Sequence, residues 1–357
     1  MSRFDKVAAK LQQYDLDAMM VTSSPNRLYA TGFRSSAGLA LITPDASYFF
    51  TDSRYIEAAT KAITGGEVRE STRENPMTKM VSELVERHGI KRLGFEESYM
   101  TVSELENTWK KNLSCEFIPA TALLTELRSV KDAEEVKTLI AAQRIAEKAF
   151  DHILGFIAPE RTEIEVALEL EFTMRKLGAQ ATSFNTIAVA GKKSAMPHGV
   201  PSDVRLGSGF FTMDFGALYQ GYCSDMTRTV VIGKADEDMK KVYNTVLEAQ
   251  TAALAAYDFG KTGREIDKVA RDIIYAAGYE GCFGHGLGHG VGMYIHEAPG
   301  LSQRVMPEDR KLTPGHIVTF EPGIYIEGKY GCRIEDMVAV LEDGILNFTH
   351  SPKELIE

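Results

Sequence analysis

Two pairs of acidic residues, each set about a tight turn, are the most chemically informative part of this 357-residue chain. Asp214 and Asp225 lie in FFTMDFGALYQGYCSDMTRTVVIG. Glu321 and Glu335 lie in IVTFEPGIYIEGKYGCRIEDMVAV. If each segment folds back on itself, the two acids of a pair face each other about 5 Å apart, where like charges repel. Two such pairs among apolar strand residues predict a positive ligand between them.

A group of histidines supplies a second kind of ligand. The segment GHGLGHGVGMYIHEAPG contains His285, His289 and His296, which are three of the eight histidines in the chain. Glycines at alternating positions let the backbone approach a site closely. A single histidine is usually structural, but three within so short a Gly-rich segment indicate a site.

These residue types favour divalent metal ions. Four carboxylates converging in a cleft cannot all stay ionised, because burial and mutual repulsion raise their pKa values. Oxygen-rich sites with an imidazole suit Mn²⁺, Fe²⁺, Co²⁺ or Zn²⁺, and the oxygen ligands favour Mn²⁺. Four carboxylates and one histidine are too many for a single catalytic ion. They suit two ions about 3.5–4 Å apart, bridged by carboxylates.

The elements that must position these acids are two β-hairpins. Apolar and β-branched runs flank a polar, Gly-containing turn in both segments. A hairpin folding about Tyr219–Gln220 would place Asp214 across from Asp225. A hairpin folding about Gly328 would place Glu321 across from Glu335.

The chain also repeats its own organisation. Thr162 begins a capping-box signal for a helix that we expect to end at Gly178, and Thr262 begins an equivalent helix that we expect to end at Gly278. Each helix is followed by a His-containing loop, with His198 in the first, and then by an acidic hairpin. We therefore expect two related halves that meet at a shared site.

The residues before this repeat predict a separate α/β domain, with limits at 1–125, followed by a second domain at 126–357. Its predicted helices are FDKVAAKLQQY and MTKMVSELVERHG, and its predicted strands are DAMMVT, LALIT, SYFFTD and RLGFEE. Asp132 is the expected N-cap of the long helix that opens the second domain.

Composition excludes several classes of protein. The net charge of −10 argues against a general nucleic-acid binder, which needs a basic surface. We expect no membrane span, because no stretch reaches about 18 apolar residues. The N-terminus lacks a secretory signal, and four scattered cysteines without CxxC spacing indicate reduced thiols. Together these features predict a cytoplasmic protein.

The chain resembles a known family, the pita-bread metallopeptidases of family M24. The resemblance lies in four segments of the second domain, DFGALYQGYCSDMTRT, HGLGHGVGMYIHEAP, EPGIYI and RIEDMV. Within the family, the match is to the Xaa-Pro peptidases aminopeptidase P and prolidase. SPNRLYATGF and FFTDSRY resemble the creatinase-type N-terminal domain. The implied fold is an α/β creatinase-like domain followed by an α+β pita-bread catalytic domain with an internal pseudo-two-fold repeat.

The resemblance also implies how two divalent metal ions are held, most simply Mn²⁺, with Co²⁺ or Zn²⁺ as alternatives. Asp214 binds one ion, His289 and Glu321 bind the other, and Asp225 and Glu335 bridge the two. The implied nucleophile is a water or hydroxide held between the ions.

Further roles follow from the same resemblance. Glu321 would accept the proton of the nucleophilic water. His198 and His296 would steady the substrate carbonyl and the tetrahedral intermediate. His285 would line the pocket for proline. In support, Arg333 would offset negative charge and orient Asp214, and Thr227 would hydrogen-bond Asp225. The implied substrate is a proline-containing peptide, and the implied assembly is a homodimer.

Five functions remain to be compared. The leading one is an Xaa-Pro aminopeptidase, and the nearest alternative is a prolidase that cleaves only dipeptides. A methionine aminopeptidase shares the ligand set but generally lacks such an N-terminal domain. A creatinase-like metal-free hydrolase or a non-catalytic peptide-binding module would usually have lost ligands that this chain retains.

Overall fold

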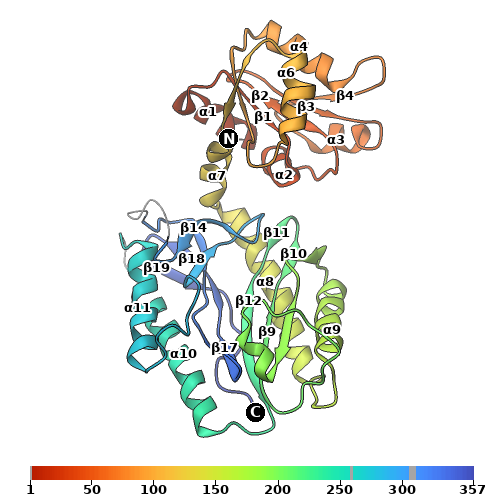
Figure 1. Ribbon diagram of the computed structural model, residues 1–357. Coiled ribbons are helices and arrows are strands. Elements are labelled where there is room, and N and C mark those ends of the chain that lie inside the picture. The colour runs from red at the N-terminus through yellow and green to blue at the C-terminus, as the bar shows by residue number, and fades with distance from the viewer. Residues whose placement is uncertain (1, 258–259, 305–310) are drawn as a thin grey trace. The chain divides into compact units, whose positions relative to one another are not determined.

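The computed structural model describes residues 2–257, 260–304 and 311–357. The chain divides into two compact units, Met1–Arg128 and Ser129–Glu357 (Figure 1). Each unit has its own hydrophobic core. The acidic hairpins and the histidine loops all belong to the second unit.

Unit 1 is built on one six-stranded sheet with the order β4-β3-β2-β1-β5-β6. Strands β1, β2 and β3 pair antiparallel, while β3–β4, β1–β5 and β5–β6 pair parallel. All the helices and strands predicted in this region are present. The strands are β1 Ala18–Val21, β2 Leu39–Ile42, β3 Ser47–Thr51, β4 Glu67–Glu70, β5 Arg92–Phe95 and β6 Glu116–Pro119. The helices are α1 Arg3–Lys10, α2 Ser24–Thr31, α3 Ile56–Ala62, α4 Met77–Arg87, α5 Val102–Glu104, α6 Lys110–Asn112 and α7 Thr121–Ser129.

Asp132, Thr162 and Thr262 cap helices of unit 2, as predicted, and Asp236 caps a further helix that we did not predict from the sequence. Asp132 caps α8 (Ala133–Leu154), and Asp236 caps α10 (Glu237–Ala255). Thr162 and Thr262 each form a capping box, with Glu165 and Glu265, at the starts of α9 (Glu163–Lys176) and α11 (Gly263–Ala276). The same two threonines each form an isolated β-bridge, to Arg205 and to Lys311. The two halves of unit 2 therefore repeat one local design, as the sequence predicted.

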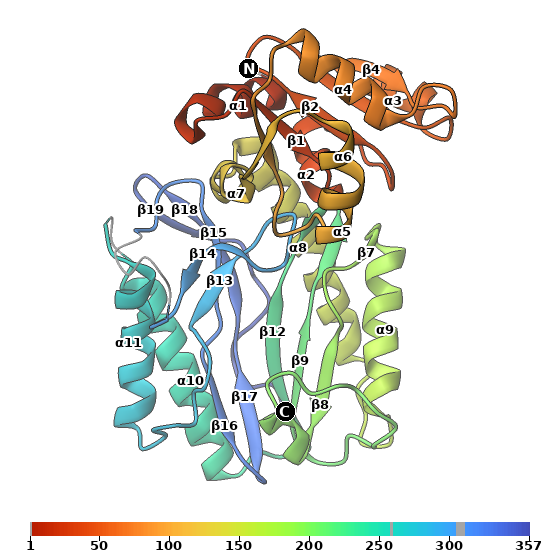
Figure 2. The ribbon, with the colours of Figure 1, turned by 45° about the horizontal axis from the view of Figure 1, so that its top comes forward.

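The strands of unit 2 lie between these helix pairs. Figure 2 shows α8 and α9 beside the strands of the first half, with α10 and α11 beside those of the second. The sheet orders are β12-β9-β8, β11-β10-β7, β14-β13-β15-β18-β19 and β16-β17. The first-half strands are β7 Ala181–Thr182, β8 Ile187–Ala190, β9 Gly209–Phe215, β10 Ala217–Tyr219, β11 Tyr222–Cys223 and β12 Met226–Ile232. The second-half strands are β13 Gly288–Gly290, β14 Glu297–Leu301, β15 Ile317–Phe320, β16 Gly323–Ile326, β17 Tyr330–Arg333, β18 Asp336–Leu341 and β19 Gly344–Asn347.

The first acidic hairpin is present, but its register differs from the prediction. In the β9–β12 ladder Asp214 pairs with Thr227, not with Asp225. The turn is centred on Gln220 and Gly221, with φ values of 49° and 85°, one residue later than expected. Positive φ at both central residues is the requirement of a type I′ hairpin turn. Moving the turn centre by one residue moves each partner by two, so Asp225 stays on the same face as Thr227.

The second acidic hairpin has the predicted register. Gly323 pairs with Arg333 in the β16–β17 ladder, and Phe320 pairs with Asp336 in the β15–β18 ladder. Both pairings belong to one continuous register about Gly328. Glu321 and Glu335 therefore occupy opposite positions in the short gap between the two ladders.

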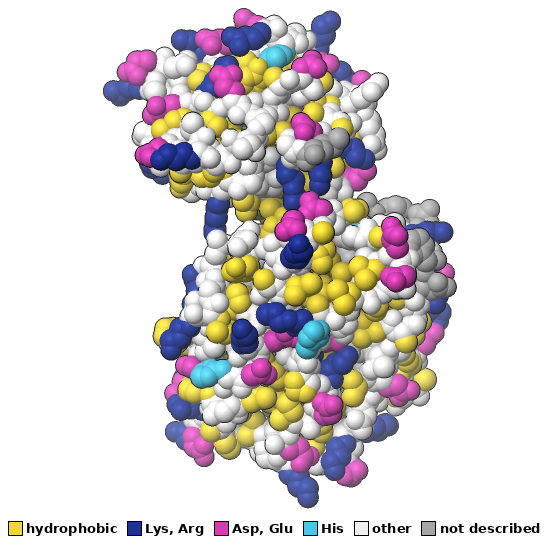
Figure 3. Space-filling view, turned by 180° about the vertical axis from the view of Figure 1, so that it is seen from behind, with side chains coloured by type: hydrophobic (Ala, Val, Ile, Leu, Met, Phe, Trp, Pro, Cys, Tyr) yellow, Lys and Arg dark blue, Asp and Glu magenta, His cyan; other side chains and the backbone are white. Residues whose placement is uncertain are grey.

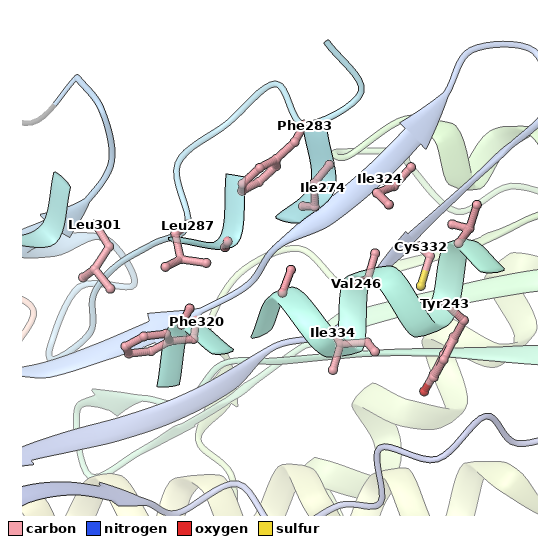
Figure 4. Close-up of a cluster of buried hydrophobic side chains, with 14 of the residues drawn as sticks. Tyr243, Val246, Ile274, Phe283, Leu287, Leu301, Phe320, Ile324, Cys332 and Ile334 are labelled. Atoms are coloured by element: carbon pink, nitrogen blue, oxygen red, sulfur yellow. The ribbon is translucent and has the colours of Figure 1, made fainter. Parts of the chain in front are cut away.

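Unit 2 contains two apolar clusters, one centred in each half, with Phe210 and Val231 of the first half contributing to the second cluster. In the second half, Tyr243 and Val246 of α10 and Ile274 of α11 pack against side chains from the strands, including Phe320 and Ile324 (Figure 4). In the first half, α8 and α9 bury residues against β8, β9 and β12. These cores fix the strands that carry the acidic side chains.

The C-terminal segment is held across the junction of the two halves by Arg228. Its buried guanidinium donates to the carbonyl oxygens of Ser351 and Pro352, at 2.8 and 3.0 Å. It also donates to the carbonyl oxygen of Glu335 at 2.6 Å and to the carboxylate of Asp336 at 2.8 Å. One side chain thus joins β12, the Glu335 segment and the chain end.

The surface carries interspersed charges. Lys and Arg side chains are scattered among Asp and Glu side chains over the face shown in Figure 3. Among the described residues, no helix has the length and apolar character needed to cross a membrane.

Candidate metal centre

Five predicted ligands converge where the two halves of unit 2 meet. Asp214 lies in β9 and Asp225 immediately precedes β12, whereas His289, Glu321 and Glu335 come from the second half. All five line one cavity of about 660 Å³.

Hydrogen bonds join the two halves beside this cavity. The amide of Glu335 donates to the carbonyl oxygen of Thr227 at 3.1 Å. The hydroxyl of Thr229 donates to the carbonyl oxygen of Arg333 at 2.9 Å. These bonds set the spacing between the acids of the first half and those of the second.

The side chains are close enough to share an ion. Single ligand atoms of Asp225, His289 and Glu335 all lie within 4.8 Å of one another. The Nε2 atom of His289 lies 3.5 Å from Asp225 Oδ2 and 3.6 Å from Glu321 Oε1. An imidazole nitrogen among carboxylate oxygens is a donor set that suits first-row divalent metals.

Burial affects the carboxylates of this site strongly. Within the described residues, Asp214 Oδ1 and Asp225 Oδ1 are buried without a hydrogen-bond partner. Burial, reinforced by the charge of Glu335, raises the pKa of Asp225 well above its usual range. Burial and the charge of Glu321 do the same to the pKa of Glu335. Divalent cations would satisfy these oxygens and remove the repulsion, so the residues fit a metal centre.

His289 is prepared to act as a ligand. Its Nδ1 lies 3.0 Å from the carbonyl oxygen of Gly290, which places the ring proton on Nδ1 and leaves the Nε2 lone pair directed at the acids. Burial lowers the pKa of His289 to about 4, so the ring is neutral near pH 7. A neutral imidazole with a free Nε2 is the form that binds metals.

Arg333 is the buried cation of the site. Its Nη2 donates to Asp214 Oδ2 at 2.7 Å, as predicted. Its Nε donates to Thr227 Oγ1 at 3.0 Å, and that hydroxyl donates to Glu335 Oε2 at 2.7 Å. The prediction that Thr227 hydrogen-bonds Asp225 was therefore wrong, because the strand places its hydroxyl toward the other half.

Tyr325 is a residue of the site that the sequence did not predict. Its hydroxyl accepts from Arg333 Nη1 at 2.7 Å and lies 2.9 Å from His285 Nε2. Since Nδ1 of His285 lies 2.8 Å from the carbonyl oxygen of Gly286, the tyrosine donates to Nε2. Burial lowers the pKa of His285 to about 4, so this ring is also neutral. The chain gives no separate signal for Tyr325 beyond its place in EPGIYI.

The remaining predicted residues line the same cavity. His198 and His296 lie in its wall, and the rings of His289 and His296 pack edge to face with centroids 4.3 Å apart. Burial, with the nearby charge of His198, lowers the pKa of His296. The other described lining residues are Phe184, Asn185, Thr186, Ile187, Pro197, Gly199, Val200, Pro201, Gly286, Gly288, Ile295 and Ser302.

Sequence comparison with known families agrees with this geometry. The Creatinase/Prolidase N-terminal domain matches residues 3–130, and metallopeptidase family M24 matches residues 137–342. The chain belongs to metallopeptidase family M24. The fold of this chain is therefore the creatinase-like domain followed by the pita-bread domain that the sequence predicted, and M24 metallopeptidases act with divalent metal ions.

Relatives of this M24 chain match it over nearly its whole length. An uncharacterised peptidase of Bacillus subtilis is 44% identical and covers 99% of both chains. The solved Xaa-Pro dipeptidase from Bacillus anthracis is 43% identical, with a TM-score of 0.95 over 99% of this chain and 98% of that one. The X-Pro aminopeptidase from Thermotoga maritima is 36% identical, with a TM-score of 0.91 over 97% and 99%. The chain is accordingly a metal-dependent hydrolase with Xaa-Pro specificity.

Proposed function

We propose that this M24 hydrolase is an Xaa-Pro aminopeptidase that accepts peptides longer than a dipeptide. The observation that carries the proposal is the charge of the cavity wall. Among the described lining residues, Arg333 is the one Lys or Arg, and it is already paired with Asp214 and bonded to Tyr325. The substrate of a strict dipeptidase ends at proline, so the enzyme must bind the C-terminal carboxylate of that proline. A buried carboxylate needs a cationic or similarly strong partner.

The alternative is an Xaa-Pro dipeptidase, and it is favoured by one specific observation. The relative from Bacillus anthracis, which is 43% identical, is named an Xaa-Pro dipeptidase. The Thermotoga maritima relative is named an X-Pro aminopeptidase at 36% identity. Identity alone therefore does not separate the two activities, whereas the lining charge supports the aminopeptidase.

In the proposed site, Asp214, Asp225, His289, Glu321 and Glu335 hold two divalent ions, with Mn²⁺ as the physiological metal. When bound, the ions supply Lewis acidity and lower the pKa of water near the scissile bond. Two observations support these ions: carboxylate oxygens are buried without a hydrogen-bond partner among the described residues, and the pKa values of Asp225 and Glu335 are raised.

The other side chains act on the substrate. Glu321 accepts a proton from the water. In the chain without metal, burial, opposed by the charge of Arg333, raises the pKa of Glu321 to about 8. Bound cations would keep this carboxylate ionised, which is the form that can act as a base. His198 and His296, in the cavity wall, stabilise the carbonyl oxygen as charge develops on it. His285 contacts the proline ring. An Xaa-Pro bond is a tertiary amide without an N–H, so recognition depends on shape and on these groups.

A peptide panel tests the proposal. Purified protein loaded with Mn²⁺, Co²⁺ or Zn²⁺ is given an Xaa-Pro-Yaa tripeptide, the matching Xaa-Pro dipeptide and an Xaa-Ala-Yaa control. We expect release of the N-terminal residue from the tripeptide, little from the alanine control, and the highest rate with Mn²⁺. Cleavage of the dipeptide alone would establish the dipeptidase instead.

Assembly and metal content are measured on the same material. We propose two ions per chain and a homodimer, so light scattering should give about twice the 39.4 kDa chain mass. Fewer than one ion per chain after Mn²⁺ loading, together with no hydrolysis, would support a non-catalytic binding module.

A further inference from the structure

A buried ion pair lies just outside the cavity wall. Lys131 Nζ is 3.3 Å from Glu297 Oε2, and the two side chains are 1% and 2% exposed. Neither residue lines the cavity. Lys131 lies two residues before the start of α8, and Glu297 is the first residue of β14.

Glu297 is connected to both histidines of the adjoining wall. It follows His296 directly in the chain, and in the β13–β14 ladder it pairs with Gly290, the residue after His289. Gly290 also supplies the carbonyl oxygen, 3.0 Å from His289 Nδ1, that orients the His289 ring. The position of Glu297 therefore sets where the two rings meet.

The carboxylate of Glu297 also fixes the loop that leads to His296. Its Oε1 accepts from the amide of Tyr294 at 3.0 Å, which closes a turn around His296. A Cβ on Gly292 would lie 2.4 Å from Glu297 Oε2, so the carboxylate lies directly against the backbone there. The carbonyl oxygen of Gly292 accepts from the amide of Cys223 at 2.8 Å, two residues before Asp225.

The backbone of Lys131 is fixed by other residues of unit 2. Its amide donates to the carbonyl oxygen of Gly315 at 2.8 Å, and its Nζ lies 3.4 Å from the carbonyl oxygen of Ser129. The ammonium therefore reaches Glu297 from a backbone that is fixed at its own end. A fully buried ion pair stabilises the folded state little more than apolar residues of similar size would. We therefore attribute to the pair an effect on the position of the loop rather than on stability.

We propose that Lys131 and Glu297 are positioning residues. They hold the His296 ring in the position against the His289 ring that hydrolysis requires. The pair acts through the 292–297 loop and touches neither substrate nor metal. This inference rests on the proposed role of His296 at the substrate carbonyl. A displacement of a catalytic side chain by about 1 Å is enough to slow the reaction by about a hundredfold.

The test compares Lys131→Met, Glu297→Gln and the double variant in the full-length, Mn²⁺-loaded enzyme. Each single variant removes one charge of a buried ion pair and keeps the other, so both should unfold at a lower temperature. The double variant removes both charges and keeps an acceptor for the Tyr294 amide, so its melting temperature should recover. We expect kcat to fall by about 10- to 100-fold in all three, with KM changed less than about threefold and metal content unchanged.

Two controls separate positioning from loss of stability. Val246→Ala opens the α10 core at a residue that does not line the cavity, so it should lower the melting temperature while kcat stays at the wild-type value. Lys131→Arg keeps the charge and should restore part of kcat. If the double variant regains wild-type kcat, or if kcat follows melting temperature through the whole set including Val246→Ala, the pair is structural and the proposal fails.

A readout that does not use hydrolysis keeps the inference separate from the proposed function. In protein labelled with ¹⁵N-histidine, the ring resonances of His296 should shift in Lys131→Met while those of His198 do not. If the wild-type enzyme cleaves no Xaa-Pro peptide, the proposed function fails and the ring shifts still report the register. If it cleaves the peptide and His296 is unmoved in the variant, only the positioning role is refuted.

Discussion

At the scale of single residues, Arg333 decides how so many acids can share one cavity. It is 3% exposed, contacts Asp214 directly and reaches Glu335 through the hydroxyl of Thr227. One buried cation still cannot balance four carboxylates. The pKa values of Asp225, Glu321 and Glu335 are raised because positive charge is lacking among these buried carboxylates. Divalent ions would supply that charge.

The role of Glu321 can be tested by a nearly isosteric change. Glu321→Gln removes both a metal ligand and the proposed proton acceptor, so kcat should fall by about a hundredfold or more while the circular dichroism spectrum is unchanged. His289→Ala should have a similar effect. The matched control is Glu327→Gln, an exposed acid at the turn of the same hairpin, which should leave kcat unaltered. Near-wild-type turnover in Glu321→Gln would remove this residue from the mechanism.

The carboxyl pKa values also predict how metal affinity depends on pH. Glu321 has a pKa raised from 4.5 to about 8, so the metal-free folded chain holds a proton there that the unfolded chain releases. Stability of the metal-free protein therefore decreases as pH rises through this window. Metal binds the ionised form and displaces the proton, so affinity should rise between pH 6 and 8 by up to about tenfold per unit for each proton released.

Isothermal titration of Mn²⁺ into metal-free protein at several pH values, in buffers of different ionisation enthalpy, measures this directly. The Glu321→Gln variant, which has no proton to displace at that position, should show a shallower pH dependence. An affinity that is flat from pH 6 to 8 in the wild-type protein would contradict the assignment.

At the scale of elements, the β10–β11 turn fixes which acids meet. Gly221 has a φ of 85°, a conformation that costs a residue with a Cβ about 1–2 kcal/mol. Gly221→Ala should therefore lower the free energy of unfolding by about that amount. Gly155 has an ordinary φ of −81°, so Gly155→Ala is the matched control and should be neutral or slightly stabilising. Equal effects of the two changes, measured by urea unfolding, would refute the turn argument.

The same hairpin shows how far the sequence could be used to predict the fold. Alternation of apolar residues and capping boxes located the helices and strands, because those signals are local. The register about Gly328 was predicted correctly, since the glycine marks the turn centre. The register of the first hairpin was wrong by two residues, because its turn centre lies between Gln220 and Gly221, and the positive φ of Gln220 is not visible from its residue type.

The candidate site shows a similar division. Acids and histidines could be named from their spacing and from family resemblance, and all of them line one cavity. Tyr325 and the partner of Thr227 were missed, because each contact joins strands from different parts of the chain. Lys131 and Glu297 are 166 residues apart, and no local pattern couples residues at that separation.

At the scale of the whole molecule, each unit has its own hydrophobic core but only unit 2 carries the predicted ligands. Removing metal with a chelator should therefore lower the melting temperature of unit 2 and leave the transition of unit 1 in place. At free metal about a hundredfold above its Kd, one site contributes about 2.7 kcal/mol to the bound unit. Calorimetry in which both transitions shift together would show that the units unfold as one.

The two halves of unit 2 bury two apolar clusters, the second of which also takes Phe210 and Val231 from the first half, and the five ligands are divided between the halves. A chain opened between β12 and α10 would give two fragments, of which one carries two of the acids and the other carries the histidine and two more. Arg228 in the first fragment would hold the chain end of the second. Peptide hydrolysis would then require the two fragments to associate. The divided enzyme could therefore serve as a reporter of fragment complementation.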